Sequence, residues 1–476
     1  MVERKNFMLE KVLDEFKKLA AIPRPSKHEE KISNFLRDYL KSYGFEVVQD
    51  SSKNIIAEIP AICGKEDSPR TILQAHMDMV CVAEENYKFN PLEDSIKLIR
   101  TEDFLTAEGT SLGADDGMGI AEILYIVKNH ENFSHGPLRI IFTVDEEQGM
   151  TGAINLDKKF LADAEFFINC DSEKFEEIVA GSAGNIHVDF SKKINFIEPK
   201  FSNALKIKFS GLHGGHSGIE ISKNYANAIK LASKFLSQGN FQLAQFDGGS
   251  APNVIPSDAE IIIGTDFSAD EIFTRADLLK SNVKKIYGEN LKIEITPVAM
   301  PEKFLSESDF ENLIALILTI HSGVYSMRGD TVISSANIGI IRTTESVEVN
   351  ILARSNVSQV LEDFTDTFAQ VAKVTKFEVK FGTPAPAWDF NPDSKLLKIM
   401  AEIFERQNNF APKILTTHGG LECSFFAVKN PKLDIVSTGT TNEFIHSPKE
   451  RLHLKTVEPH VNLIIETLAQ ISNLPR

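Results

Sequence analysis

The 476-residue sequence lacks the marks of several large protein classes. It has one Trp and 7 Tyr beside 33 Phe, so few rings carry a polar group and no base-stacking surface for nucleic acid is expected. Its four cysteines are far apart, which argues against a zinc ribbon and for a reducing compartment. No apolar run approaches the ~20 residues that cross a bilayer. The N-terminus also lacks a signal-peptide core. We expect a cytoplasmic protein without a membrane partner.

Positive charge is also scarce. The chain holds 51 Lys and Arg against 67 Asp and Glu, a formal charge of −16, which repels nucleic acid and excludes it as an expected partner. An excess of carboxylates accompanies cation sites, although an ordinary solvated surface gives the same count. With 42% hydrophobic and 25% charged residues, the composition is that of a globular protein, and the length predicts two domains.

The order of predicted elements indicates an α/β fold. Amphipathic helices are expected over 7–19 and 28–43, with Ser26 available as a cap, and apolar strands then alternate with helices, which predicts a mostly parallel sheet flanked by helices. Between about 184 and 383 the strands become alternating, and two successive strand-helix-strand-strand-helix-strand passes fit this segment. The sequence therefore predicts a first domain in two parts, 1–183 and 385–476, and an inserted α+β domain over 184–384 with ferredoxin-like halves.

Three consecutive strands of the first part end in residues that bind metals. One strand ends in Ala75-His76-Met77-Asp78, the next in Asp145-Glu146-Glu147 and the third in Cys170-Asp171. The carboxyl ends of parallel strands lie at one edge of the sheet, where open α/β sheets place their sites. Asp115, in a glycine-rich turn before a helix, is a further candidate, although capping the helix is an equally good explanation for this residue alone.

Each of these residues also has an ordinary structural explanation. A strand-end His is usually only hydrogen-bonded, but His76 and Asp78 point to the same face, so Asp78 could accept the imidazole N–H that a metal does not use. A run of three acids is usually a solvated turn. After a buried strand, however, it is costly unless cations offset the repulsion. Glu146 and Glu147 point in different directions, so one could bind metal while the other transfers protons.

The charges favour two divalent ions. Asp115, Glu147 and Asp171 with one hydroxide supply four negative charges, and His76 with a second His would complete the coordination, with Asp115 bridging. Oxygen and imidazole ligands favour zinc, with manganese and cobalt as alternatives. The second histidine comes from the C-terminal segment. We favour His446, since it follows an apolar run and a glycine turn; the alternatives are His418, His453 and His460.

The motifs resemble those of the co-catalytic di-zinc metallopeptidases, a family that includes aminoacylases and glutamate carboxypeptidases. Within it they are most similar to those of the aminoacyl-histidine dipeptidases. The resemblance spans nearly the whole chain and rests on eight motifs that occur in the family's order: AlaHisMetAsp (75–78), GlyAlaAspAspGly (113–117), AspGluGluGlnGlyMetThrGlyAla (145–153), AsnCysAspSerGlu (169–173), GlyLeuHisGlyGlyHisSerGly (211–218), AsnValIlePro (253–256), HisGlyGlyLeuGluCys (418–423) and HisSerProLysGluArg (446–451).

The resemblance implies a role for each matching position. One metal would be held by His76, Asp115 and Asp171, and the other by Asp115, Glu147 and His446. Glu146 would be the general base, Asp78 would orient His76, and His216 would stabilise the oxyanion, from its own chain or across a homodimer formed through the inserted lid. Substrate contacts would come from Asn253, Arg354, Gly419 and Gly420, for which a cap, a surface cation and a turn are the structural alternatives.

The implied reaction is hydrolysis of dipeptides with a free N-terminus, including Xaa-His dipeptides. A hydroxide bridging the two metals would attack the carbonyl while Glu146 transfers the proton. Asp at position 171 favours a peptidase over relatives that cut N-acyl groups. The alternatives are an N-acyl amino acid hydrolase on the same scaffold and a metal-binding protein without activity. The sequence argues against a metal-binding protein without activity, because every ligand position and the general-base position hold the residue that the family pattern requires.

Overall fold

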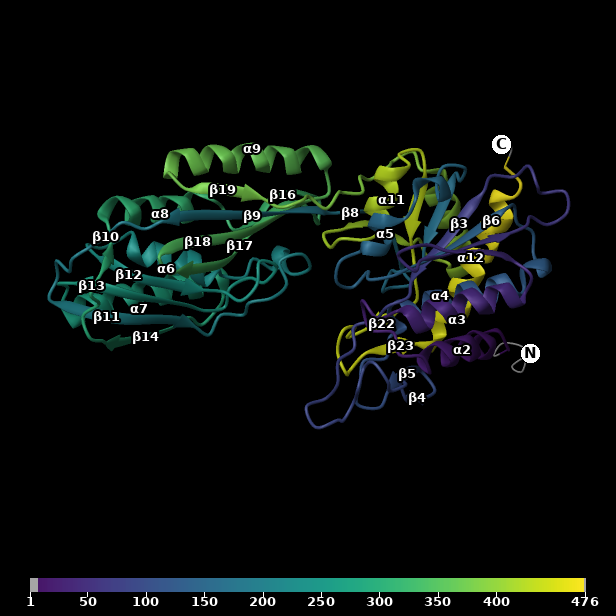
Figure 1. Ribbon diagram of the computed structural model, residues 1–476, viewed down its shortest axis with the longest axis horizontal. Helices are drawn as coiled ribbons and strands as arrows, with labels where there is room; N and C mark the ends of the chain where they lie inside the picture. Colours follow the sequence, from purple (N-terminus) through teal and green to yellow (C-terminus); the bar gives the residue numbers. More distant parts are fainter. Residues whose placement is uncertain (1–6, 475–476) are drawn as a thin grey trace. The chain divides into compact units, whose positions relative to one another are not determined.

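A computed structural model describes residues 7–474, which divide into two units (Figure 1). The first unit comprises the described residues up to Gly181, then Phe390–Thr416, and the described residues from Leu421 onward; the second comprises Ser182–Asp389 and Thr417–Gly420. Each unit has its own hydrophobic core. The domain ranges 1–183, 184–384 and 385–476 that we inferred from the sequence stay a prediction.

The first unit is an α/β layer structure. Its elements are α2 (Phe7–Ala20), α3 (Glu30–Ser42), β1 (Glu46–Gln49), β2 (Ile55–Ile59), β3 (Thr71–His76), β4 (Leu98–Arg100), β5 (Phe104–Ala107), α4 (Ala114–Lys128), β6 (Leu138–Thr143), α5 (Thr151–Asn155), β7 (Phe166–Asn169), β8 (Glu177–Ser182), α10 (Lys395–Asn408), β20 (Lys413–Thr417), α11 (Cys423–Lys429), β21 (Asp434–Ser437), β22 (Asn442–Glu443), β23 (Arg451–His453) and α12 (Val457–Ile471).

Eight of these strands form one sheet in the order β1-β2-β6-β3-β7-β21-β8-β20. The four central strands, β6, β3, β7 and β21, run parallel, and β1, β2 and β8 add antiparallel pairs on either side. Every residue of β3, β6 and β7 is buried, as expected for parallel strands covered on both faces. Helices α2, α4 and α12 pack against one another in the first unit (Figure 1). The predicted α/β class with a parallel core is confirmed.

A small four-stranded sheet, β22-β23-β5-β4, joins distant parts of the first unit. Strand β23 pairs with β5, with Leu452 opposite Leu105. The pairing brings the turn before β23, which contains His446, beside the segment that follows β5 and leads into α4. A turn from the N-terminal part of the chain and one from its C-terminal segment therefore meet through main-chain pairing.

The second unit is built on one antiparallel sheet. Its elements are β9 (Gly184–Lys193), β10 (Phe196–Ile197), β11 (Asn203–Ser210), α6 (Ala228–Leu236), β12 (Gln242–Gly248), β13 (Ala259–Thr265), α7 (Ala269–Tyr287), β14 (Lys292–Pro297), β15 (Phe304–Leu305), α8 (Glu307–Thr319), β16 (Gly323–Arg328), β17 (Thr331–Thr343), β18 (Ser346–Ser355), α9 (Ser358–Thr375) and β19 (Glu378–Phe381).

The strand order β14-β11-β13-β12-β17-β18-β9-β19 resolves into two ferredoxin-like halves joined edge to edge at β12 and β17. One half is β11-α6-β12-β13-α7-β14. The other takes β9 from before the first half and α8-β17-β18-α9-β19 from after it. The expectation of two successive passes was wrong in this respect, because the first half is inserted within the second. Spacing along the chain could not reveal this, since the whole first half separates β9 from its partners β18 and β19.

Candidate metal centre and catalytic site

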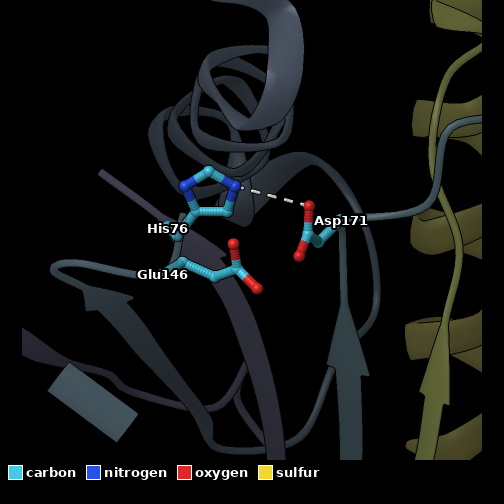
Figure 2. A group of neighbouring side chains, drawn as sticks. All are labelled: His76, Glu146 and Asp171. Atoms are coloured by element: carbon cyan, nitrogen blue, oxygen red, sulfur yellow. Dashed lines mark ion pairs between the residues drawn. The ribbon is translucent and has the colours of Figure 1, made fainter. Parts of the chain in front are cut away.

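The parallel register of the first unit sets the predicted ligands at one edge of the sheet. His76, the last residue of β3, lies opposite Thr143 at the end of β6, and Gln74 lies opposite Asn169 at the end of β7. The residues that follow β6 and β7, Glu146–Glu147 and Asp171, therefore leave the sheet beside His76. Figure 2 shows His76, Glu146 and Asp171 turned toward one another.

His76 is almost completely buried, with 1% of its side chain exposed. Its Nε2 lies 3.1 Å from Asp115 Oδ1 and 3.4 Å from Asp171 Oδ1, and its Nδ1 lies 3.4 Å from Asp78 Oδ1. The imidazole thus faces two acids with one nitrogen and a third with the other. This is the arrangement in which a carboxylate can fix the tautomer of a metal-binding histidine.

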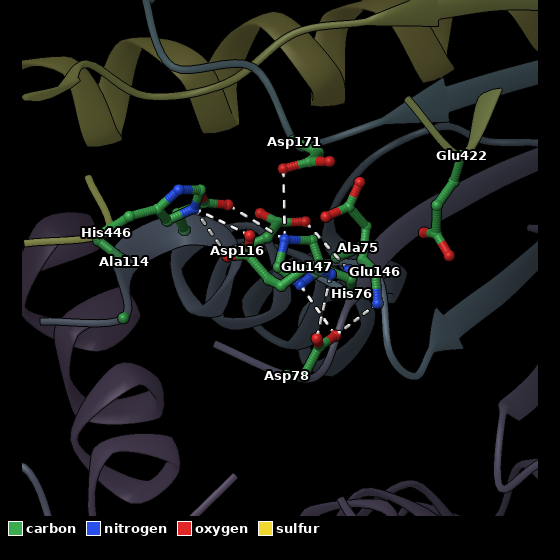
Figure 3. Close-up of polar contacts among 12 residues, drawn as sticks. Ala75, His76, Asp78, Ala114, Asp116, Glu146, Glu147, Asp171, Glu422 and His446 are labelled. Atoms are coloured by element: carbon green, nitrogen blue, oxygen red, sulfur yellow. Dashed lines mark hydrogen bonds and ion pairs between the residues drawn. The ribbon is translucent and has the colours of Figure 1, made fainter. Parts of the chain in front are cut away.

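Asp115 lies between two imidazoles. While Oδ1 faces His76, Oδ2 lies 3.2 Å from His446 Nε2. The same nitrogen of His446 is 2.9 Å from Glu147 Oε2; Figure 3 shows His446 and Glu147. A carboxylate that offers one oxygen to each side has the geometry needed to bridge two ions. The capping explanation for Asp115 fails, because the N-cap of α4 is Gly113, the backbone of Asp115 is not helical, and the Asp115 carboxylate faces the two imidazoles.

Asp78 orients three other residues of the site. Its carboxylate accepts hydrogen bonds from the backbone N–H groups of Glu146 (3.0 Å) and Glu147 (3.2 Å), in addition to its contact with His76. It also accepts a bond from Ser26 Oγ at 2.8 Å. The expectation that Ser26 caps the second helix was therefore wrong, since α3 begins only at Glu30 and the hydroxyl holds Asp78 instead.

The electrostatics of the site reflect crowded, buried acids. Burial, and then the charge of Asp171, raise the pKa of Glu146 well above its usual range, and burial raises the pKa of Asp171 to about 8. Burial alone would lower the pKa of His446, but its hydrogen bonds with Asp115 and Glu147 raise it to about 11. Acids held this close favour protonation or a bound cation.

The residues present fit divalent cations. Within residues 7–474, two groups have ligand atoms within 4.8 Å of one another: His76, Glu146 and Asp171, and His76, Asp115 and Glu147. All five predicted ligands lie in this region, and their oxygen and imidazole atoms are the donors that zinc, manganese and cobalt share. The first group differs from the predicted set of His76, Asp115 and Asp171. It contains Glu146, the expected base, in place of Asp115. The assignment of individual ligands stays a prediction.

Sequence reasoning gave no role to a polar layer beneath these ligands. Gln74 Nε2 and Thr143 Oγ1 both donate to Glu422 Oε2, at 2.7 and 2.6 Å, and Gln74 accepts a bond from Asn169 at 2.7 Å. Gln74 lies two positions before His76 on β3 and so shares its face of the sheet, and Thr143 and Asn169 are the last residues of β6 and β7. Burial raises the pKa of Glu422 to about 7. Glu422 belongs to the HisGlyGlyLeuGluCys motif, but only the structure shows that it accepts hydrogen bonds from Gln74 and Thr143.

The substrate contacts implied by the resemblance lie in the second unit. Nδ1 of His216 accepts hydrogen bonds from the backbone N–H groups of Gly218 and Ile219, both at 3.3 Å, which leaves the proton of a neutral ring on Nε2. Gly218 packs against both His216 and Arg354, since a Cβ there would come within 3.3 Å of each. Asn253 is exposed, and its carbonyl accepts the N–H of Ser217.

Arg354 is a buried cation, with 7% of its surface exposed. Its Nε has no hydrogen-bond partner in the part of the chain that the structure describes, and burial lowers its pKa to about 10. The surface-cation explanation is therefore excluded. Gly419 and Gly420 follow His418 in the same unit. These contacts stay predictions.

The comparisons with known proteins agree with one another. The model of "Peptidase family M20/M25/M40" matches residues 72–470. The chain is 32% identical over 480 residues to the cytosol non-specific dipeptidase of Escherichia coli, covering 96% of this chain and 97% of that protein. The crystal structure of aminoacylhistidine dipeptidase from Vibrio alginolyticus superposes with a TM-score of 0.87 at 31% identity, over 97% of this chain and 96% of that one.

A more distant structure shares the fold. The aminopeptidase PepT of Bacillus cereus matches with a TM-score of 0.58 at 17% identity, over 98% of this chain and 99% of that one. Among the helices of residues 7–474, none is long and apolar enough to span a membrane.

Proposed function

The chain belongs to peptidase family M20/M25/M40, and from this premise we propose that it hydrolyses dipeptides with a free N-terminus, including Xaa-His dipeptides. The observation that carries the proposal is the likeness over nearly the full length to two proteins named as dipeptidases. The cluster of acids and imidazoles at the sheet edge supports a metal-dependent reaction. One relative is named a cytosol dipeptidase, which supports a cytoplasmic location.

We assign the metal sites to His76, Asp115 and Asp171 and to Asp115, Glu147 and His446. Zinc is the proposed metal, with manganese and cobalt as alternatives. When bound, two such ions supply Lewis acidity, which polarises a carbonyl and acidifies a water molecule. The proposed assembly is a homodimer through the second unit.

The proton transfers of the reaction are assigned to the chain's own residues. Glu146 takes a proton from the attacking water and returns it to the leaving amine, and its raised pKa suits a group that must both accept and donate near neutral pH. Asp78 holds the backbone of Glu146 and the ring of His76, so base and ligand keep their relative positions.

The second unit contains groups suited to bind two parts of a dipeptide, the oxygen of the reacting carbonyl and the C-terminal carboxylate. His216 keeps an N–H on Nε2, which can donate to the oxyanion, within its own chain or across a dimer. Arg354 is a desolvated cation without a carboxylate of its own chain within ion-pair distance among the described residues, which suits the C-terminal carboxylate of a dipeptide. Asn253, Gly419 and Gly420 are assigned to the substrate backbone.

A substitution at the base tests the mechanism. Glu146→Gln keeps the shape of the side chain but cannot accept the proton, so kcat should fall by roughly 10²- to 10⁴-fold while KM and metal content stay near the wild-type values. Glu131→Gln, at an exposed position after α4, is the control for loss of a carboxylate. Activity of Glu146→Gln within a few-fold of the wild type would refute the assigned role.

The substrate class is tested separately with a panel of free dipeptides, Ala-His among them, beside N-acetyl amino acids. We expect hydrolysis of the free dipeptides. Cleavage of the N-acetyl compounds alone would refute the dipeptidase assignment in favour of an N-acyl amino acid hydrolase.

A further inference from the structure

Glu450 joins two turns of the first unit that carry proposed metal ligands. Its side chain is buried, with 2% of its surface exposed. Oε2 accepts hydrogen bonds from the backbone N–H groups of Leu112 (2.7 Å) and Gly113 (2.9 Å), and Oε1 accepts those of Ala114 (2.8 Å) and Asp115 (3.4 Å). One carboxylate thus binds four consecutive amides at the start of α4, including the amide of Asp115 itself.

The turn that contains His446 and a turn closed by the backbone of Glu450 follow each other directly. The N–H of Glu450 donates to the carbonyl of Ser447 at 3.1 Å, and Ser447 Oγ donates to the carbonyl of Phe444 at 2.6 Å. His446 lies within this closed turn with a φ of 56°, a left-handed conformation that a residue with a side chain adopts only when its surroundings hold it. The turn that holds His446 therefore shares Ser447 with the turn that Glu450 ends.

A local residue could not provide the same contact. Helices usually receive a Ser, Thr, Asp or Asn side chain at the N-cap, but here the N-cap is Gly113, with a φ of 70°. A Cβ on Gly113 would lie 2.6 Å from Met79 Sδ and 2.7 Å from Arg24 Nη2, so a capping side chain does not fit. The amides are bound instead by a carboxylate from the C-terminal segment of the chain.

Other contacts hold the Asp115 turn from its second side. Arg24, also buried, donates to the carbonyl oxygens of Met77 (3.0 Å), Asp78 (2.8 Å) and Gly113. The carboxylate of Glu450 is bound by the four amides at the positive end of α4, and the buried guanidinium of Arg24 also attracts it electrostatically. Because these amides are bound by Glu450, both carboxylate oxygens of Asp115 remain directed at His76 and His446.

We propose that Glu450 is a positioning residue that fixes Asp115 and His446 relative to each other, so that the two turns form one metal-binding unit. The proposal rests on the ligand set given under Proposed function. It predicts that weakening the contact between the turns lowers the affinity for metal. A purely structural cap would lower stability and leave metal affinity unchanged.

The test uses the full chain after removal of metal with a chelator. Zn²⁺ is titrated into wild type, Glu450→Gln and Glu443→Gln in competition with a zinc indicator. Glu450→Gln keeps the length of the side chain but places an amide N–H₂ against backbone donors, so we expect zinc affinity to fall roughly 10- to 100-fold, the usual effect of losing a group that positions a ligand. Glu443→Gln, in the same segment and 38% exposed, should bind zinc as the wild type does.

Each outcome decides between explanations. If Glu450→Gln binds two zinc ions with wild-type affinity, whatever its melting temperature, the positioning role is refuted and the proposed ligands stand. If the wild type itself does not bind two zinc ions, the ligand set is refuted and this proposal with it.

A second variant covers the case in which Glu450→Gln fails to fold. Ser447→Ala removes only the side-chain bond that closes the His446 turn, and it should lower zinc affinity about 10-fold, the lower end of the usual effect. Wild-type affinity in Ser447→Ala would then refute the proposal. Wild-type far-UV circular dichroism of the apoproteins establishes that the variants are folded.

Discussion

The buried histidine of the second unit should make the stability of that unit depend on pH. His418 is 9% exposed; its Nδ1 lies 3.0 Å from Asn356 Oδ1 and its Nε2 2.8 Å from Ser335 Oγ. A neutral ring satisfies both partners, with Nδ1–H donating to the amide oxygen and Nε2 accepting the hydroxyl. Burial, and then the charge of Arg354, lower the pKa of His418 to about 3.

The sign follows from the number of protons bound in each state. Below its ordinary pKa of 6.5 the histidine of the unfolded chain is protonated, whereas the folded chain keeps it neutral down to about pH 3. The unfolded state therefore binds more protons in this range, and the free energy of unfolding falls as pH falls. Between pH 7 and pH 4 this one group should remove up to about 3 kcal/mol, at 1.36 kcal/mol for each unit of pKa difference.

The assay compares His418→Gln with the wild type in urea at pH 7 and pH 4. The chain's single tryptophan, Trp388, is buried in the same unit as His418, so its fluorescence follows the unfolding of that unit. The variant should be less stable at pH 7, because one of the two hydrogen bonds is lost, and should lose about 3 kcal/mol less than the wild type on going to pH 4.

His321→Gln, at an exposed position of the second unit, is the matched control. It should show the same pH dependence as the wild type. Equal losses of unfolding free energy in His418→Gln and the wild type would refute the buried neutral histidine.

Two further predictions concern substrate and metal. Arg354→Met should raise KM for dipeptides about 10- to 100-fold, because a charged hydrogen bond to the carboxylate is lost. It should also raise the unfolding free energy of the second unit, because an unpaired buried charge is removed. Steady-state kinetics measure the first effect and urea unfolding the second. An unchanged KM would contradict the assignment of Arg354 to the substrate carboxylate. Removal of metal should lower the calorimetric melting temperature of the first unit, since an ion at 100 times its Kd stabilises by about 2.7 kcal/mol. Trp388 fluorescence should not follow that change, and equal melting with and without chelator would contradict a metal in the folded chain.

The part of the site that could be predicted from the sequence depends on local patterns. His76, Glu147 and Asp171 follow apolar runs that are long enough to identify as buried strands, and the rule for parallel sheets then places their ends together. Asp78 follows from the two-residue repeat of a strand. The family resemblance added residues such as His216, whose motif contains no pattern that local reasoning could interpret.

The parts that could not be predicted depend on contacts between distant segments. Glu450 and Glu422 look like ordinary acids in the sequence, one in a turn and one before a short helix, and their partners lie in the N-terminal part of the chain, before the second unit begins. The nesting of the two ferredoxin-like halves has the same origin, because the pairing of β9 with β18 leaves no trace in the spacing of apolar residues. The prediction that Ser26 caps a helix was wrong for a related reason. A serine before a helix is typical of a cap, and only the structure shows that its hydroxyl donates to Asp78.

The five proposed ligands reach their places in two different ways, and this difference bears on how the site forms. His76, Glu147 and Asp171 follow adjacent parallel strands, so the sheet that buries the core also sets their spacing. Asp115 and His446 lie in turns, and the bonds of Glu450 and the pairing of β23 with β5 hold them together. Because Glu450 and His446 both come from the C-terminal segment, the sheet can bring three proposed ligands together while Asp115 still lacks its support. High metal affinity should therefore require docking of that segment, so the second part of the first unit is as necessary to the site as the strands that carry most of its ligands.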